Sequence, residues 1–173
     1  MKKTSTVLFF GCLLFVATSL SAQENSFAAN SPASNFNYPD SKTGAQSLDL
    51  VDVNADALTD FSSKYKDAEE VKWSASGKTL SVYFKQNDVP MRSTYTANGK
   101  LEYTICYYVG SHIPEKIKNI IKRDKYNMEI MQVTEIQRRH QTIDLVRLED
   151  ANAILTLRVE GNSIEPYETL TKD

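Results

Sequence analysis

Residues 61–101 read FSSKYKDAEEVKWSASGKTLSVYFKQNDVPMRSTYTANGKL, and this stretch decides the fold. Between residues 79 and 85, apolar and polar side chains alternate, which is the pattern of a half-buried β-strand. The Asn98-Gly99 pair predicts a tight hairpin, because both residues tolerate the positive φ angles of such a turn. The stretch therefore predicts the end of a helix followed by antiparallel strands. It holds no residue pattern typical of catalysis.

A helix is expected immediately before these strands. Asn54 or Asp56 can cap it, and Leu58, Phe61 and Tyr65 recur at the helical spacing i, i+3, i+7. After the hairpin, every second residue is apolar. This predicts a strand whose core-facing residues are Leu101, Tyr103, Ile105, Tyr107 and Val109.

A second helix is expected after residue 113. Pro114 suits its first turn, and Glu115 favours the positive end of the helix dipole. The apolar residues that follow are spaced to form one buried stripe, and the lysines between them face away. This stripe consists of Ile117, Ile120 and Ile121.

Further strands are expected at residues 128–136, 142–148 and 153–159, and a turn at Gly161-Asn162 precedes a last one. The alternation slips within 142–148, which predicts a β-bulge or a strand covered on both sides. Helix plus four strands therefore occurs twice, with a period of about 64 residues. Chance similarity among hairpins is the alternative. The predicted fold class is α+β, with two helices packed on an antiparallel β-sheet as a pseudo-repeat.

Residues 1–22 have the features of a secretory signal peptide. Lys2 and Lys3 precede an apolar run at 7–17, and small residues lead to a cleavage point after Ala22. No later apolar run is long enough to span a bilayer. A lipoprotein signal with Cys12 as the lipidated residue is the rival interpretation. It would need an unusually short apolar region, because the run continues past the cysteine. We therefore expect a periplasmic or secreted protein.

Residues 23–53 are rich in Ser, Asn, Ala and Asp and show no regular apolar period. Such a segment buries too little apolar surface to offset its ordering entropy, so we expect a flexible polar segment. The alternative is that residues 36–39 dock on the domain or on a partner. Residues 54–170 are expected to form one α+β domain.

Charge and cysteine content narrow the possible partners. The formal net charge is −2, and loss of Lys2 and Lys3 with the signal makes it −4. A mildly acidic chain gives no reason to expect nucleic acid as a partner. Cys106 is the one cysteine left after cleavage, so no intramolecular disulfide is possible and the fold must depend on its apolar core.

The spacing Tyr65-x5-Val71-x-Trp73, the strand Val82-x-Phe84, the hairpin Tyr95-x2-Asn98-Gly99-x-Leu101 and the Ile113-Pro114 helix start resemble one family. It is the PepSY-like, β-lactamase-inhibitor-protein-like (BLIP-like) family of exported bacterial proteins. The resemblance covers residues 58–165. It implies helices on an antiparallel sheet, export, and a binding or inhibitory role without catalytic residues. The second half departs from the pattern, with Ile143 where a tyrosine is expected.

The residues that could carry chemistry are few. His112 and His140 lie far apart, and no Cys, His, Asp or Glu grouping has metal-ligand spacing. The acidic run from Asp49 to Asp56 lacks the pattern of a calcium loop, so we interpret it as solvated and helix-capping. Cys106 lies in the middle of a strand without a Cys-His motif beside it. We therefore predict no enzyme, no metal site and no cofactor.

Two features could serve recognition. Tyrosines are dense in the sheet, and a tyrosine offers a rigid ring with a polar tip. Tyr83 and Tyr108 fall out of phase with the apolar face and Tyr103 belongs to the same set, although packing in the sheet is the simpler interpretation. The second helix has a cationic face that includes Lys118 and Lys122, for which a solvated surface is the simpler interpretation.

The sequence thus predicts an exported, non-enzymatic binding module. Its expected partner is a protein of the cell envelope, against which it acts as an interaction or inhibitor protein. The alternative is an envelope sensor of a small molecule or metal, with the seam between helix and sheet as its pocket. The residues do not indicate an oligomeric state.

Overall fold

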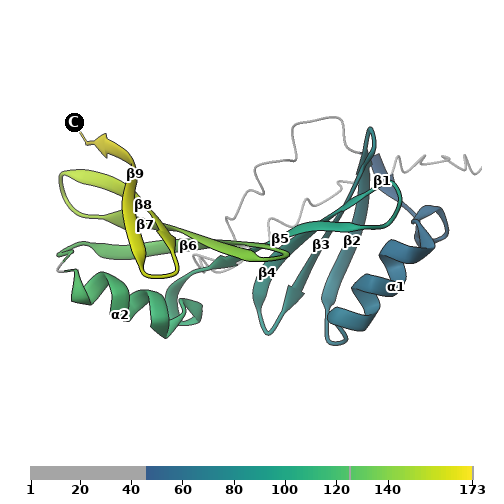
Figure 1. Ribbon diagram of the computed structural model, residues 1–173, viewed down its shortest axis with the longest axis horizontal. Helices are drawn as coiled ribbons and strands as arrows, with labels where there is room; N and C mark the ends of the chain where they lie inside the picture. Colours follow the sequence, from purple (N-terminus) through teal and green to yellow (C-terminus); the bar gives the residue numbers. More distant parts are fainter. Residues whose placement is uncertain (1–45, 125, 173) are drawn as a thin grey trace, which may run out of the picture. The chain divides into compact units, whose positions relative to one another are not determined.

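The computed structural model describes residues 46–124 and 126–172 (Figure 1). The predicted signal peptide, Cys12 and most of the polar segment 23–53 lie outside the described residues. The elements in chain order are β1 (Gln46–Leu48), η1 (Leu50–Asp52), α1 (Ala55–Lys64), β2 (Glu69–Ser76), β3 (Thr79–Gln86), β4 (Val89–Thr96), β5 (Leu101–Tyr108), η2 (Gly110–His112), α2 (Glu115–Arg123), β6 (Glu129–Arg138), β7 (Gln141–Glu149), β8 (Ala153–Glu160) and β9 (Ser163–Thr171).

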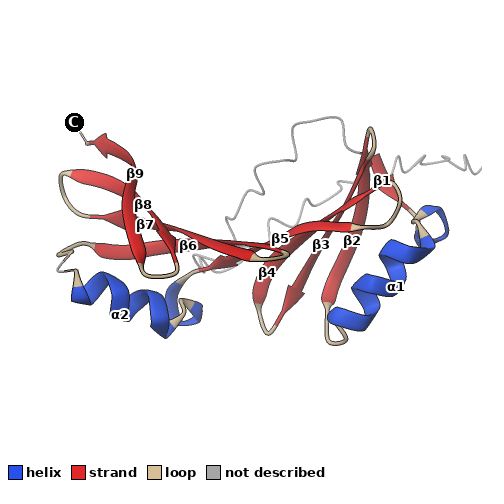
Figure 2. Cartoon of the chain, in the orientation of Figure 1, coloured by secondary structure: helices blue, strands red, loops and turns tan. Residues whose placement is uncertain are grey.

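All nine strands of the described residues form one antiparallel sheet, and their order in the sheet is their order in the chain (Figure 2). Each strand therefore pairs only with its sequence neighbours. The α+β fold class is confirmed, and so is the order of one helix followed by four strands, twice. Equivalent strands begin 60 to 64 residues apart, for example Glu69 and Glu129 or Val89 and Ala153.

Both helices cover the same face of the sheet. Cys106 belongs to the core under α1, and Val133 belongs to the core under α2. In the β5–β6 ladder, Cys106 lies opposite Glu135 and Tyr108 lies opposite Val133. Residues directly opposite one another, and those two apart along a strand, point to the same face. Figure 1 accordingly has α1 and α2 on one side of the sheet.

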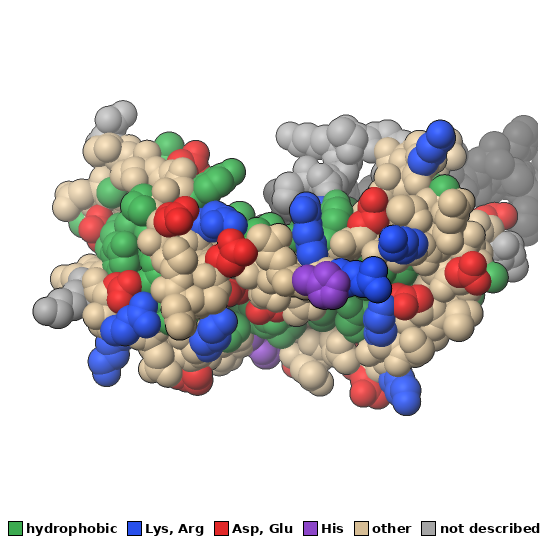
Figure 3. Space-filling view, in the orientation of Figure 1, with side chains coloured by type: hydrophobic (Ala, Val, Ile, Leu, Met, Phe, Trp, Pro, Cys, Tyr) green, Lys and Arg blue, Asp and Glu red, His purple; other side chains and the backbone are tan. Residues whose placement is uncertain are grey.

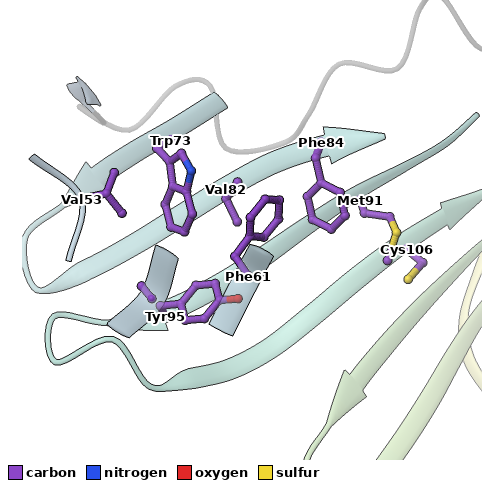
Figure 4. Packing of buried hydrophobic residues seen from close by; sticks show 9 residues of the cluster. Val53, Phe61, Trp73, Val82, Phe84, Met91, Tyr95 and Cys106 are labelled. Carbon is purple, nitrogen blue, oxygen red and sulfur yellow. The ribbon is translucent and has the colours of Figure 1, made fainter. Parts of the chain in front are cut away.

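The core under α1 is built around Phe61. Its ring centroid lies 5.5 Å from that of Trp73 and 5.0 Å from that of Phe84, and both contacts are edge-to-face (Figure 4). This is the favourable arrangement for aromatic pairs and adds about 0.5–1.5 kcal/mol per pair to the burial of the rings. The helical spacing predicted this contact side of α1, since Phe61 is buried and Leu58 and Tyr65 pack against the same core.

Asn54 begins α1 and also anchors the Asn98-Gly99 hairpin to it. Its Oδ1 accepts hydrogen bonds from the backbone N–H of Asp56 at 2.9 Å and of Ala57 at 3.2 Å, as an N-cap does. Its Nδ2 donates to the carbonyl of Ala97 at 3.1 Å. Gly99 has a φ of +78° and packs so closely that an added Cβ would lie 2.4 Å from Asn54 Oδ1.

The core under α2 is aliphatic. The predicted stripe of Ile117, Ile120 and Ile121 is confirmed, and all three side chains are buried. They pack against fully buried residues of three neighbouring strands, which are Val133, Val146, Leu148, Leu157 and Val159. The two cores are distinct clusters, and Tyr108 packs against both.

One strand prediction is wrong. The alternation suggested that Tyr103, Ile105 and Tyr107 of β5 face the helices. The residues that face the helices are instead Thr104, Cys106 and Tyr108. A β-bulge is the cause. Tyr95 lies opposite Leu101 while Thr94 lies opposite Tyr103, so Glu102 is an extra residue that shifts the strand to the opposite phase. Leu101 still packs against the core under α1.

Two further details refine the predictions. The register shift near β7 lies in its partner β6, between Ile130 and Gln132. β7 is not covered on both faces, because Ile143 and Leu145 are half-buried on the side away from the helices but Arg147 is exposed there. The folded part begins before residue 54, because β1 pairs with β2 and Val53 is buried in the core.

Candidate functional site

The face of the sheet opposite the helices carries a row of side chains that crosses five strands. Tyr83 lies opposite Arg92, Arg92 opposite Ile105, Ile105 opposite Ile136, and Ile136 opposite Ile143. All five side chains are half-buried. Among the described residues, no helix covers this face, which we call the open face. It presents an aromatic, a cation and three isoleucines side by side.

Two arginines on the open face lie over tyrosine rings. The Arg92 guanidinium is 5.9 Å from the centroid of the Tyr83 ring, and that of Arg138 is 6.0 Å from the Tyr103 ring. Such cation–π contacts are worth about 0.5–1 kcal/mol at exposed sites and restrict the side chains involved. Both tyrosines were predicted as binding residues, and the structure places them on the same face.

The other three predicted residues lie elsewhere. Tyr108 points toward the helix side, where its hydroxyl donates to Glu135 Oε1 at 3.4 Å, and burial raises its pKa. Lys118 lies on α2 with its Nζ 2.7 Å from Glu115 Oε1, and Lys122 is exposed on the same helix. The structure therefore brings together Tyr83 and Tyr103 and separates them from Tyr108, Lys118 and Lys122.

An acidic pair lies on the helix side of the sheet, and sequence reasoning missed it. Asp144 lies directly opposite Glu135 in the β6–β7 ladder and is only 3% exposed. Burial, and after it the charge of Glu135, raise the pKa of Asp144 to about 6, although the charge of Lys116 opposes both effects. Among described atoms, Asp144 Oδ1 has no hydrogen-bond partner. An aspartate amid the apolar residues of 143–148 was the available signal.

Cys106 is a buried thiol. Burial raises its pKa to about 12, and the charge of Glu135 acts in the same direction. A cysteine nucleophile needs a depressed pKa and a neighbouring base, so this environment opposes the chemistry. Within residues 46–124 and 126–172, no three His, Cys, Asp or Glu side chains are grouped so that they could hold a metal ion.

Two adjoining pockets lie at the β-bulge of β5, with volumes of about 460 and 470 Å³. Residues 100–103 and the tip of the β6–β7 hairpin line both, and the C-terminal end of α1 closes one side of the first. Basic side chains are prominent in the lining, namely Lys100, Arg138 and Arg139 in both pockets and Lys64 in the first. Figure 3 shows basic side chains gathered beside a histidine near the middle of the molecule.

No protein-family model matches the chain, and no curated protein matches it. Solved structures do. A DUF2874 family protein from Bacteroides ovatus superposes with a TM-score of 0.54 at 17% identity, over 69% of this chain and 87% of that one. A BLIP-like protein from Bacteroides fragilis gives a TM-score of 0.54 at 13% identity, over 69% and 86% of the two chains.

The chain has the BLIP-like fold. The predicted resemblance is thereby confirmed at the level of architecture, since the identities are too low to carry a function. A third neighbour is a candidate periplasmic protein from Bacteroides eggerthii, with a TM-score of 0.52 at 13% identity over 69% of this chain and 88% of that one. In the part of the chain that the structure describes, none of the helices has the length and apolar character needed to cross a membrane.

Proposed function

We propose that this protein is an exported, non-enzymatic binding module that engages a protein of the cell envelope through the open face of its sheet. The observation that carries the proposal is the row from Tyr83 to Ile143. Hot spots of protein interfaces are enriched in tryptophan, tyrosine and arginine, and here Arg92 and Arg138 lie over the rings of Tyr83 and Tyr103. An inhibitory effect on an envelope hydrolase or peptidase would follow from such binding.

Other features support this proposal over catalysis, and two of them support a place in the cell envelope. The buried Cys106 thiol has a raised pKa, which disfavours the thiolate that acyl transfer requires. The signal-like residues 1–22 and the candidate periplasmic neighbour favour export. Tyr83 and Tyr103 would be the main contacts. A partner that also contacted the helix side of the sheet would meet Lys118 and Lys122 on α2. It would also meet Tyr108, which packs against both apolar cores.

The test is affinity capture by the full chain from envelope extract of the native organism, read by mass spectrometry. Any stoichiometric protein is then purified, and its affinity is measured by calorimetry for the parent chain and for two variants. Tyr83→Ala with Tyr103→Ala should weaken binding by at least about tenfold, as loss of interface anchors does. Tyr167→Ala is the matched control, because Tyr167 is exposed on β9 and belongs to neither tyrosine–arginine pair.

Equal affinity of the parent chain and the Tyr83/Tyr103 variant would contradict the assignment of the open face. An extract that returns no stoichiometric protein, with the chain shown to be folded, would contradict the protein-binding role itself.

A second candidate function has one observation in its favour. The pocket of about 460 Å³ lies between α1 and β5, where the sequence placed a sensor site, and its volume is typical of small-molecule sites. A ligand that binds only the native state raises the melting temperature in proportion to RT ln(1 + [L]/Kd). A thermal-shift screen of small molecules and divalent metals tests this, and a uniformly unchanged melting temperature would count against a sensor.

A further inference from the structure

We infer that the two adjoining pockets at the β5 bulge, which we call the bulge cleft, bind an acidic peptide segment of the partner. The inference rests on the proposed function and specifies the chemistry of one contact. It starts from charge. The chain as a whole is acidic, with a formal net charge of −2, but the bulge cleft collects four basic residues against two acidic ones.

The acidic residues offset only part of that charge. Asp60 is already engaged, because both its oxygens lie within 2.8 Å of Lys64 Nζ and one of them accepts from the Tyr95 hydroxyl at 3.1 Å. Glu102 is then the one acidic residue of the lining left to offset the charges of Lys100, Arg138 and Arg139. Within the described residues, none of these three cations forms an ion pair. The bulge cleft is thus a concave site with a local excess of positive charge.

The arrangement favours an extended ligand with several carboxylates over a single small anion. Lys100 comes from the β4–β5 hairpin, whereas Arg138 and Arg139 come from the β6–β7 hairpin. The two pockets share residues 100–103 together with Arg138 and Arg139, so an extended chain that entered both would place more than one carboxylate near these cations. Arginine's planar fork suits bidentate carboxylate binding. Tyr103, held under Arg138, offers a ring surface between the charges.

The bulge itself shapes the bulge cleft. A bulge leaves its extra residue outside the ladder and bends the strand. Here the extra residue is Glu102, which lines both pockets. The same irregularity that reversed the phase of β5 therefore turns Tyr103 to the open face, next to the basic hairpin tip. The bulge cleft adjoins the proposed interface and would extend it.

The test uses the full chain and a fluorescently labelled acidic probe, a peptide of seven alternating Glu and Asp residues. The neutral probe is the same peptide with Gln in place of Glu and Asn in place of Asp. Fluorescence polarisation at low salt should report binding of the acidic probe and at least tenfold weaker binding of the neutral one. Arg138→Gln with Arg139→Gln should weaken the acidic probe at least tenfold. The matched control, Lys116→Gln with Arg123→Gln, removes the same charge from α2, which lines neither pocket, and should change affinity less than twofold.

Three results would overturn the inference. The first is no binding of the acidic probe, and the second is an equal loss of affinity for the acidic probe in both double variants. The third is full competition by inorganic phosphate supplied at the same total negative charge as the probe, which would indicate a site for small anions. Circular dichroism confirms that the variants fold. If the acidic probe fails while the Tyr83/Tyr103 variant still loses its partner, only this inference falls. If both fail, the proposed function falls with it.

Discussion

Replacing Gly99 with alanine separates two contributions that glycine makes to the first half of the fold. Gly99 has a φ of +78° and Gly77 a φ of +59°, so alanine at either position adopts a left-handed conformation at a cost of about 1–2 kcal/mol. At Gly77, a new Cβ would meet nothing within 4 Å. At Gly99, it would lie 2.4 Å from Asn54 Oδ1 and 2.7 Å from the backbone nitrogen of Ala57.

The second contribution is therefore the contact between the hairpin and the first turn of α1. A Cβ at position 99 displaces Asn54, which loses an N-cap worth about 1 kcal/mol and its hydrogen bond to Ala97, worth about another 1 kcal/mol. We expect Gly99→Ala to lower the free energy of unfolding by about 3–4 kcal/mol and Gly77→Ala by about 1–2 kcal/mol. Urea denaturation measures both, with the single tryptophan, buried Trp73, as the fluorescent reporter.

The reasoning also predicts how the two positions couple. Asn54→Gly removes the nearest clashing atom and retains a residue acceptable at an N-cap. Gly99→Ala should then cost less in the Asn54→Gly background than in the parent chain. Equal losses for Gly99→Ala and Gly77→Ala, within about 0.5 kcal/mol, would refute the proposed contact between hairpin and helix.

Three further outcomes are expected. Asp144, with its pKa raised to about 6, stabilises the fold fully below its ordinary pKa of 3.8, and this stabilisation is lost as the pH rises through 6. In the parent chain the free energy of unfolding should therefore fall by about 2–3 kcal/mol between pH 4 and pH 7, and Asp144→Asn should abolish this fall, as measured by urea titrations at several pH values. Phe61→Ala should cost about 3–5 kcal/mol in the same assay at pH 7, and a loss below about 1 kcal/mol would contradict its central place in the core. The Cys106 thiol, with its pKa raised to about 12, should not react with a thiol reagent at pH 8 until the protein is unfolded, and rapid native-state labelling would contradict its burial.

The sequence predicted those features that arise within one element. The helical spacing of Phe61, the isoleucine stripe of α2 and the Asn98-Gly99 turn are local patterns, and all three are found in the structure. The phase of β5 was mispredicted because its bulge depends on the register between two strands, which no single strand encodes.

The candidate site was only partly accessible for the same reason. Tyr83 and Tyr103 were named from tyrosine density, but their arginine partners come from other positions in the sheet. The opposition of Asp144 and Glu135 and the approach of Arg138 to Lys100 are set by strand pairing over tens of residues. The residue types in the sequence give little indication of which side chains such pairing brings together.

The order of the strands has a consequence for how the chain folds. Because every strand pairs with its sequence neighbours, native contacts form across short loops, and topology of this kind favours rapid folding. The two halves are linked through the β5–β6 ladder, whose register runs from Thr104 to Tyr108 against 133–137, while each keeps its own apolar cluster. They can therefore behave as two cooperative units in native-state hydrogen exchange. The amide hydrogens of β7 and β8 would then exchange at a rate different from that of the amide hydrogens of β3 and β4. A partner that bound to both halves at once would reduce the difference between these two rates.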